Sequence, residues 1–299
     1  MSKFHIADDR VLLRVTGSNR IDLLQGVISN DVLKVSEDRA IWAAFLTPQG
    51  KYLHDFFVIS DGESLLLDGE KGRIGDLQKR LRRYTLRLDA RVEVEDDLAV
   101  AVDIAALPPD LDQEDLIVFR DPRVKGAGNR YIGEASLLIH ALRAAGLTEA
   151  SSMDWDAHRL VLGLPDGARD FRVEKSTLPE GNADLLGAID WQKGCWMGQE
   201  VTARMHYRGL VKRRMMPMKI EGPAPNPGAP VMKGNLQIGE CRSSAGGMVM
   251  TIVRSDGILN EIAGGQTQPL MSGESRLRPA PPAWLIAALA GNESACQTA

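Results

Sequence analysis

The chain has 299 residues, of which 44% are hydrophobic and 25% are charged, and its formal net charge at pH 7 is -4. This length is enough for one large domain or for two to three smaller ones. The negative net charge argues against direct, stable nucleic-acid binding, which needs a positive surface. The longest apolar run near either end, residues 284–290, is too short to cross a bilayer, so no membrane span is expected.

The first ten residues and the cysteines bear on the compartment. The stretch MSKFHIADDR carries acidic residues and no apolar run, so it resembles neither a secretory signal nor a transit peptide. Cys195, Cys241 and Cys296 are widely separated and have no metal-ligand spacing. We therefore expect a cytoplasmic protein without a disulfide framework or a metal site.

Strand and helix patterns alternate in the first third of the chain. Residues 11–15 read as a strand, and Ser18 is a candidate cap for a helix with apolar residues at helical spacing. The segment 41–60 reads as two strands around the turn Thr47-Pro48-Gln49-Gly50, which places Asp55 on the returning strand. The further elements expected in this part are a strand at 64–68, a helix at 74–84 and a strand at 86–94.

The rest of the chain changes from mixed to strand-rich texture. The mixed part predicts strands at 98–104 and 116–119, a Pro/Asp-rich connection at 107–115, and helices at 135–145 and 151–162. From residue 210, short apolar pieces separated by Gly, Pro and Asn favour a small β-barrel or sandwich. Prolines at 279–282 lead to a short terminal helix and a polar tail. The class predicted is α+β followed by all-β.

The stretch KGCWMGQE, residues 193–200, places one thiol in an unusual setting. A thiol acts as nucleophile or metal ligand only as the thiolate, which a nearby cation such as Lys193 favours. Gly194 and Gly198 leave the backbone uncrowded on both sides of Cys195. A lone cysteine is, however, more often a small buried hydrophobe. Both interpretations stay open on the residues alone.

This stretch resembles the signature of the YgfZ family of folate-binding proteins, relatives of the glycine-cleavage aminomethyltransferase (T protein). The Lys-Gly-Cys and Gly-Gln-Glu parts both match, and Trp196 stands where the family usually has Tyr or Phe. The resemblance covers most of the chain. Its other carriers are LLQGVISNDV, TPQGKYLHDFFV, LRRYTLRLDARVEV and LPEGNADLLGAIDW, at residues 23–32, 47–58, 81–94 and 178–191.

The resemblance implies an α+β, aminomethyltransferase-like fold: a three-domain ring with a central channel and a C-terminal β-barrel. On this basis we expect a first α+β part at 1–110, a second α+β part with the motif at 111–209, a barrel at 210–283, and a short helix and tail at 284–299. The periodicity of the sequence supports the order of these parts.

The family also implies tetrahydrofolate or a derivative as the cofactor. One carboxylate can accept hydrogen bonds from two adjacent pterin donors, and the resemblance assigns this to Glu180, with Asn182 beside it. Asp55 would approach the reacting part of the folate and assist transfer of the one-carbon unit, although His54 stands where the T protein often has a second acidic residue. The remaining candidates for the folate site are Lys193, Gln199, Arg204, Arg208 and Arg213, of which the arginines suit the carboxylates of the glutamate tail.

The leading hypothesis is a folate-binding protein that helps to assemble, maintain or repair iron-sulfur clusters, including those used in tRNA methylthiolation. Cys195 would be the functional thiol, and client or assembly proteins would be the partners. One thiol cannot hold a cluster alone, because such clusters are usually bound by four thiolates. The alternatives are an aminomethyltransferase, in which a cysteine at this position is not usual, and a non-enzymatic folate sensor or scaffold. Whether the protein is an enzyme is thus left open.

Overall fold

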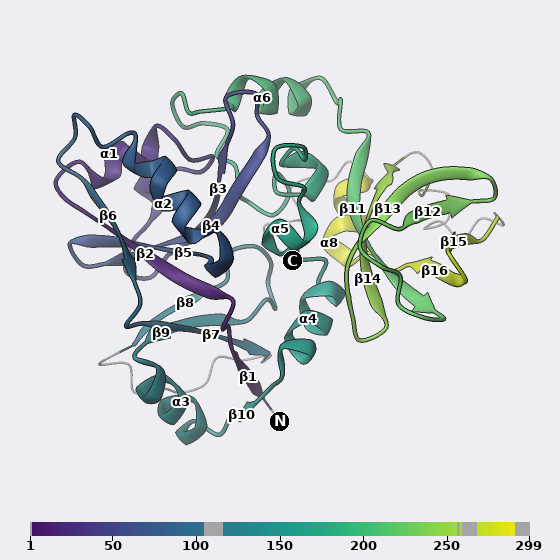
Figure 1. Cartoon of the computed structure of the whole chain (residues 1–299), viewed down its shortest axis with the longest axis horizontal. Helices are drawn as coiled ribbons and strands as arrows, with labels where there is room; N and C mark the ends of the chain where they lie inside the picture. The colour runs from purple at the N-terminus through teal and green to yellow at the C-terminus, as the bar shows by residue number, and fades with distance from the viewer. Residues whose placement is uncertain (1, 105–115, 256–257, 259–267, 291–299) are drawn as a thin grey trace. The chain divides into compact units, whose positions relative to one another are not determined.

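The chain forms two compact units, each made from two segments of the sequence. Unit 1 consists of Met1–Ser152 and Gly187–Gln199, and unit 2 of Met153–Leu186 and Glu200–Ala299. The computed structural model, drawn in Figure 1, describes residues 2–104, 116–255, 258 and 268–290. None of the helices in these ranges is long and apolar enough to span a membrane.

The first sheet of unit 1 is antiparallel and has the strand order β3-β4-β5-β2-β6. The expected hairpin supplies the edge strand β3 and its neighbour β4, with Leu46 facing Tyr52 across the Pro-Gln-Gly turn. Helix α2 contributes its apolar side chains Ile74, Leu77 and Leu81 to the core. The elements are β2 (Arg10–Thr16), α1 (Arg20–Gln25), η1 (Val32–Lys34), β3 (Ile41–Leu46), β4 (Tyr52–Asp61), β5 (Ser64–Glu70), η2 (Lys71–Arg73), α2 (Ile74–Arg82) and β6 (Arg91–Glu95).

The second sheet of unit 1 has the order β10-β1-β7-β9-β8 and combines the start of the chain with residues up to 149. Phe4 of β1 and Leu138 of α3 lie in one fully buried cluster with Tyr131 of β9, because α3 packs its apolar face against this sheet. The elements are β1 (Lys3–Ile6), β7 (Ala99–Ile104), β8 (Ile117–Arg120), β9 (Asn129–Gly133), α3 (Ala135–Ala144) and β10 (Thr148–Glu149).

Unit 2 contains a closed barrel with the strand order β11-β14-β13-β12-β15-β16, drawn in green to yellow in Figure 1. Helix α8 is tied to the end of α4 by a hydrogen bond from Trp284 Nε1 to the carbonyl of Leu162, at 2.9 Å. The elements are α4 (Ser152–Val161), α5 (Gly167–Asp170), η3 (Pro179–Gly181), α6 (Gln199–Tyr207), β11 (Arg213–Glu221), β12 (Pro230–Lys233), β13 (Leu236–Ala245), β14 (Met248–Arg254), β15 (Leu270–Ser272), β16 (Ser275–Pro279) and α8 (Ala283–Leu289).

The predicted class is confirmed, while two local predictions are wrong. The cap of α1 is Asn19, because the Ser18 hydroxyl donates to Asp89 instead, at 2.8 Å. The strand expected from residue 86 begins only at Arg91, and Leu86 is 87% exposed in the turn before it. The connection at 107–115 and the tail at 291–299 lie outside the described residues. The four-part division and the ring stay predictions.

Candidate functional site

The segment 187–199 carries all of the motif except Glu200, and within unit 1 it is joined by hydrogen bonds to the loop after α1. Ser29 Oγ donates to the carbonyl of Ala188 at 2.6 Å, and the Ser29 carbonyl accepts from the backbone N–H of Asp190 at 3.0 Å. Asn30 Nδ2 donates to the carbonyl of Gly187 at 2.8 Å. Within this segment, Cys195 has an exposed, free thiol. The exposure excludes the interpretation of Cys195 as a buried hydrophobe.

Lys193 and Asp190 hold the turn just before the thiol. The buried Lys193 ammonium donates to the carbonyls of Ile28 and Asn30, at 2.9 and 2.6 Å, and burial lowers its pKa to about 8. Although burial alone would raise it, the pKa of Asp190 is lowered, because the carboxylate pairs with Lys34 and accepts the N–H groups of Gln192 and Lys193. The Lys193 ammonium is thus engaged by backbone oxygens.

The second half of the motif packs against the turn between β3 and β4. Gly198 has φ +86°, and a Cβ there would lie 2.8 Å from the carbonyl oxygen of Thr47, so only glycine fits without displacement. Gln199 closes the loop: its N–H donates to the Trp196 carbonyl at 3.2 Å, and its side-chain Oε1 accepts the Trp196 N–H at 3.4 Å. Gln199 therefore shapes the backbone that presents Cys195.

Asp55 is a buried carboxylate on β4 with two aromatic partners. Tyr52 donates its hydroxyl to one oxygen at 2.5 Å and Trp42 donates Nε1–H to the other at 3.0 Å. Burial, and then the neighbouring Asp55 charge, raise the pKa of Tyr52 well above its usual value. His54 points elsewhere, to Asp76 at 2.9 Å, and burial lowers its pKa to about 4, so the imidazole is neutral at pH 7. The two neighbours therefore do not form a dyad.

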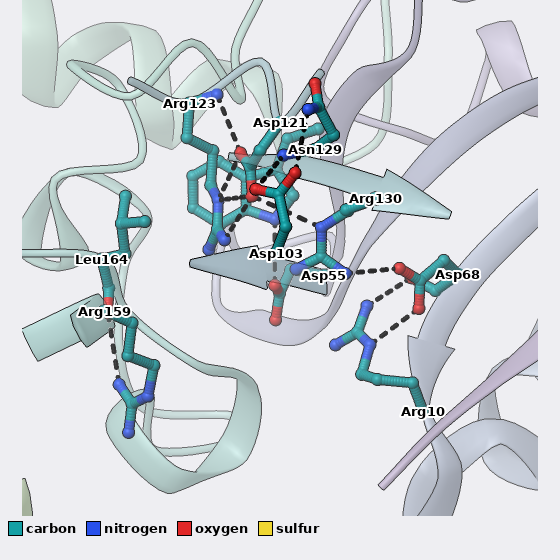
Figure 2. Close-up of polar contacts among 11 residues, drawn as sticks. Arg10, Asp55, Asp68, Asp103, Asp121, Arg123, Asn129, Arg130, Arg159 and Leu164 are labelled. Carbon is teal, nitrogen blue, oxygen red and sulfur yellow. Dashed lines mark hydrogen bonds and ion pairs between the residues drawn. The ribbon is translucent and has the colours of Figure 1, made fainter. Parts of the chain in front are cut away.

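A buried charge network surrounds this part of unit 1, and the sequence did not predict it. Asp68 binds Arg10 at 2.7 Å and Arg130 at 2.8 Å, and Asp121 binds Arg123 at 2.7 Å (Figure 2). Arg123 also lies over the ring of Trp42, at 5.4 Å, and so supports the donor that holds Asp55. Arginines from distant segments share no local pattern that would reveal such a cluster.

In unit 2, the turn at η3 carries Glu180 and Asn182. One Glu180 oxygen, Oε2, accepts the N–H and hydroxyl of Thr177 at 2.9 and 3.0 Å. Asn182 is fully buried with φ +58° and donates Nδ2–H to the Met215 carbonyl at 2.9 Å, while its Oδ1 has no partner among the described residues. The turn therefore holds an unsatisfied buried acceptor beside a carboxylate.

Arg214 positions this turn, a role that no pattern in the sequence predicted. It pairs with both oxygens of Asp184, at 2.8 and 3.0 Å, and donates to the Pro179 carbonyl at 2.8 Å. Gly181 completes the packing, since a Cβ there would lie 2.0 Å from the Phe171 ring. No sequence signal separates Arg214 from the neighbouring Arg213.

The three arginines expected at a folate tail differ in their surroundings. Arg204 is exposed and pairs with Glu200 at 2.7 Å, Arg208 is exposed at the end of α6, and Arg213 reaches Glu240 at 3.4 Å. Within the described part of the chain, no group of three His, Cys, Asp or Glu side chains is arranged to hold a metal ion.

The structure thus brings the predicted residues together in two sets. Cys195, Lys193, Gln199 and Asp55 belong to unit 1, where the first three share one loop. Glu180 and Asn182 share the η3 turn of unit 2. The three arginines also belong to unit 2, but they lie outside this turn. Their roles in catalysis and cofactor binding stay predictions.

Comparisons with known proteins give relatives and a fold. Residues 212–286 match the family model for the CAF17 C-terminal beta-barrel domain. The chain is 29% identical over 279 residues to the human iron-sulfur cluster assembly factor IBA57, mitochondrial, covering 84% of this chain and 77% of that one. It is 31% identical over 225 residues to the Mycosarcoma maydis homolog, also named mitochondrial, covering 70% of this chain and about half, 55%, of that one.

Among solved structures, the aminomethyltransferase T of the Bartonella henselae glycine cleavage system matches with a TM-score of 0.76 at 14% identity, covering 94% of this chain and 85% of that one. This likeness confirms the aminomethyltransferase-like fold. The expectation of a cytoplasmic protein is wrong, because the relatives named above are mitochondrial proteins. It rested on the composition of ten residues and on the cysteine count, neither of which distinguishes one reducing compartment from another.

Proposed function

We propose that this protein acts in iron-sulfur cluster assembly and that Cys195 is its functional thiol. The observation that carries the proposal is the exposed thiol on a loop fixed by Lys193, Asp190 and Gly198. A fixed loop presents the sulfur in one place, which lowers the entropy lost when a partner or cluster binds. The similarity to proteins named as iron-sulfur cluster assembly factors supports the proposal that this thiol acts in cluster assembly.

In this proposal Cys195 ligates the cluster only transiently, while the cluster is passed on to another protein. A thiolate is the ligand that iron-sulfur clusters prefer, and usually four are needed. In the described part of the chain the second thiol, Cys241, is buried in the barrel and belongs to the other unit. The remaining ligands would therefore come from a client or assembly protein, with Cys195 as one contact during transfer.

We also propose that the η3 turn binds tetrahydrofolate or a derivative. A pterin ring offers adjacent N–H and amino donors, and the turn offers matching acceptors: Glu180, of which one oxygen is held by Thr177, and the unpaired Oδ1 of Asn182. The residues thus fit the group. Arg214 fixes the turn, so the acceptors are preorganised. When bound, the folate would supply a carrier for one-carbon units.

The test of the thiol is complementation in cells that lack the protein. Wild type, Cys195→Ala and Cys296→Ala are expressed at matched levels, and the activities of iron-sulfur enzymes are measured together with tRNA methylthiolation. We expect wild type and Cys296→Ala to restore activity and Cys195→Ala to fail. Equal rescue by Cys195→Ala would make the thiol dispensable, and unchanged activities in the deletion strain would refute the assembly role and lead to a one-carbon transfer assay with Asp55→Asn.

The test of the folate site is a direct binding titration with tetrahydrofolate. Removing the Glu180 charge by Glu180→Gln should weaken binding about tenfold or more, since a charge-assisted pair becomes a neutral one. Glu274→Gln removes an exposed charge from the turn between β15 and β16 and is the control, which should bind as wild type does. Equal affinities for all three proteins would place folate elsewhere or exclude it.

A further inference from the structure

Unit 2 contains a pocket that neither the motif nor the η3 turn uses. Its volume is about 410 Å³, which suits a small molecule. It is formed by α5, by the segment that follows it and by two pieces of the barrel region. Ten residues line it, and those that carry charge are Arg169, Asp170, Arg172, Lys175 and Arg242.

The lining is strongly basic, and its acidic member is already neutralised. Four of the ten lining residues are Arg or Lys, and Asp170 alone is acidic. The buried Asp170 carboxylate accepts from Arg159 at 2.8 Å and from the Ser243 hydroxyl at 2.6 Å. Figure 2 shows how Arg159 is also held by the carbonyl of Leu164, at 3.2 Å. Asp170 is thus engaged by its own partners. Arg169 is paired with Asp156 and Asp166, at 2.5 and 2.9 Å, so Arg172, Lys175 and Arg242 set the charge of the pocket.

Arg242 gives the pocket a buried cation with unused hydrogen-bonding capacity. Its side chain is 6% exposed, and its Nε has no partner among the described residues. Glu240 accepts from three guanidinium groups at once, those of Arg172, Arg213 and Arg242, at 2.5, 3.4 and 2.7 Å. One carboxylate therefore faces three cations. Burial lowers the pKa of Arg242, and repulsion from Arg172 and Arg213 adds to this effect, while the Glu240 carboxylate opposes it.

The rim of the pocket is held in a preformed turn. The Arg172 carbonyl accepts the N–H groups of Lys175 and Ser176, at 3.1 and 2.8 Å, and Ser176 Oγ accepts the Arg172 N–H at 2.9 Å. Glu174 takes φ +60° within this turn, a conformation that is uncommon for residues other than glycine. Across the pocket, Gly228 leaves the space beside Arg172 open, since a Cβ there would lie 4.0 Å from Arg172 Nη2.

We propose that this pocket binds a small molecule with at least two negative charges, carried by phosphate or carboxylate groups. Arg172 and Lys175 at the rim would meet the charged groups first, and Arg242 would donate from below through its unused N–H. Forked guanidinium donors match both anions in geometry, and a bound polyanion would supply the charge that Glu240 alone does not. This site does not rest on the proposed function.

The test is isothermal titration of the full chain with pyrophosphate and, separately, with citrate. We expect one site for at least one of the two anions, and the stronger binder identifies the phosphate or the carboxylate source. Arg172→Gln/Lys175→Gln should weaken binding about tenfold or more, because it removes two of the four cations. The control Arg276→Gln/Arg278→Gln removes the same charge from exposed positions on β16 and should leave affinity within about twofold.

A third variant distinguishes a binding role from a structural one. Glu240→Gln removes the internal carboxylate that competes for the three arginines, so it should tighten anion binding, and the anion should raise its melting temperature more than that of wild type. Absence of binding by both anions overturns the proposal. Equal weakening in the rim variant and in the β16 control also overturns it, because it would show attraction by overall charge.

Discussion

The ammonium of Lys193 lies 2.6 Å from the carbonyl oxygen of Asn30, a residue 163 positions earlier in the chain. With the second bond to Ile28, this contact fixes the loop that presents Cys195. The motif lysine therefore acts on the position of the thiol through the backbone of another segment.

Replacing this lysine should loosen unit 1. Lys193→Met removes the donor from two carbonyls, and we expect the free energy of unfolding to fall by about 2–3 kcal/mol. Urea denaturation measures it. Lys219→Met, at an exposed position on β11, serves as the control and should stay within about 0.5 kcal/mol of wild type. A similar small effect for both variants would contradict the anchoring role.

The two motif glycines should respond differently to alanine. Gly198→Ala introduces a Cβ into the Thr47 carbonyl at a residue with φ +86°, and we expect a loss of about 1–3 kcal/mol in thermal or urea unfolding. Gly194→Ala meets no atom within 4 Å and should be nearly neutral. If both variants were equally stable, Gly198 would not require its left-handed conformation.

The thiols should differ in reactivity. In a Cys296→Ser background, a maleimide reagent should modify the exposed Cys195 in the native protein and Cys241 only after unfolding. Burial raises the pKa of the Cys241 thiol and also blocks access to it. Mass spectrometry of the native and denatured protein measures the sites. Cys195→Ser should remove the native label, and its stability should match wild type within about 0.5 kcal/mol.

His54 should make stability depend on pH in a defined window. Its pKa is about 4 in the folded chain against 6.5 ordinarily, so between these values the unfolded chain binds more protons. The free energy of unfolding should therefore fall as pH drops from 6.5 to 4, by up to about 3 kcal/mol from this group. In His54→Gln this contribution should vanish while the donor to Asp76 is kept. An unchanged pH profile would show that His54 titrates normally.

Local sequence patterns predicted the elements that depend mainly on interactions between residues close together in the chain. The hairpin around Pro48 and Gly50 formed as expected because proline and glycine fix the turn and the flanking residues need only pair with each other. The interior face of α2 followed from its helical spacing. The pairing of β1 with β7 and β10 did not follow, because its partners lie about 100 or more residues apart and leave no local signal.

The candidate site divides in the same way. Cys195 and Glu180 were found from motifs that lie together in the sequence. Other features depend on tertiary contacts that no spacing in the sequence encodes. They are the hydrogen bonds of Lys193, the stacking of Arg123 on Trp42 and the ion pair of Arg214 with Asp184. The predicted strand at Leu86 was too long because alternation of residue types also occurs in an exposed turn.

Unit 1 is built from two segments that are separated in the sequence by part of unit 2, and this order affects folding during synthesis. Unit 1 uses Gly187–Gln199, but the ribosome delivers Met153–Leu186 of unit 2 before that segment. The Ser29 and Asn30 contacts to Ala188 and Gly187 can form only after this later segment has emerged. Until then the nascent amino-terminal unit exposes the place where residues 187–199 will lie, and it is completed only when the segment carrying Cys195 leaves the exit tunnel.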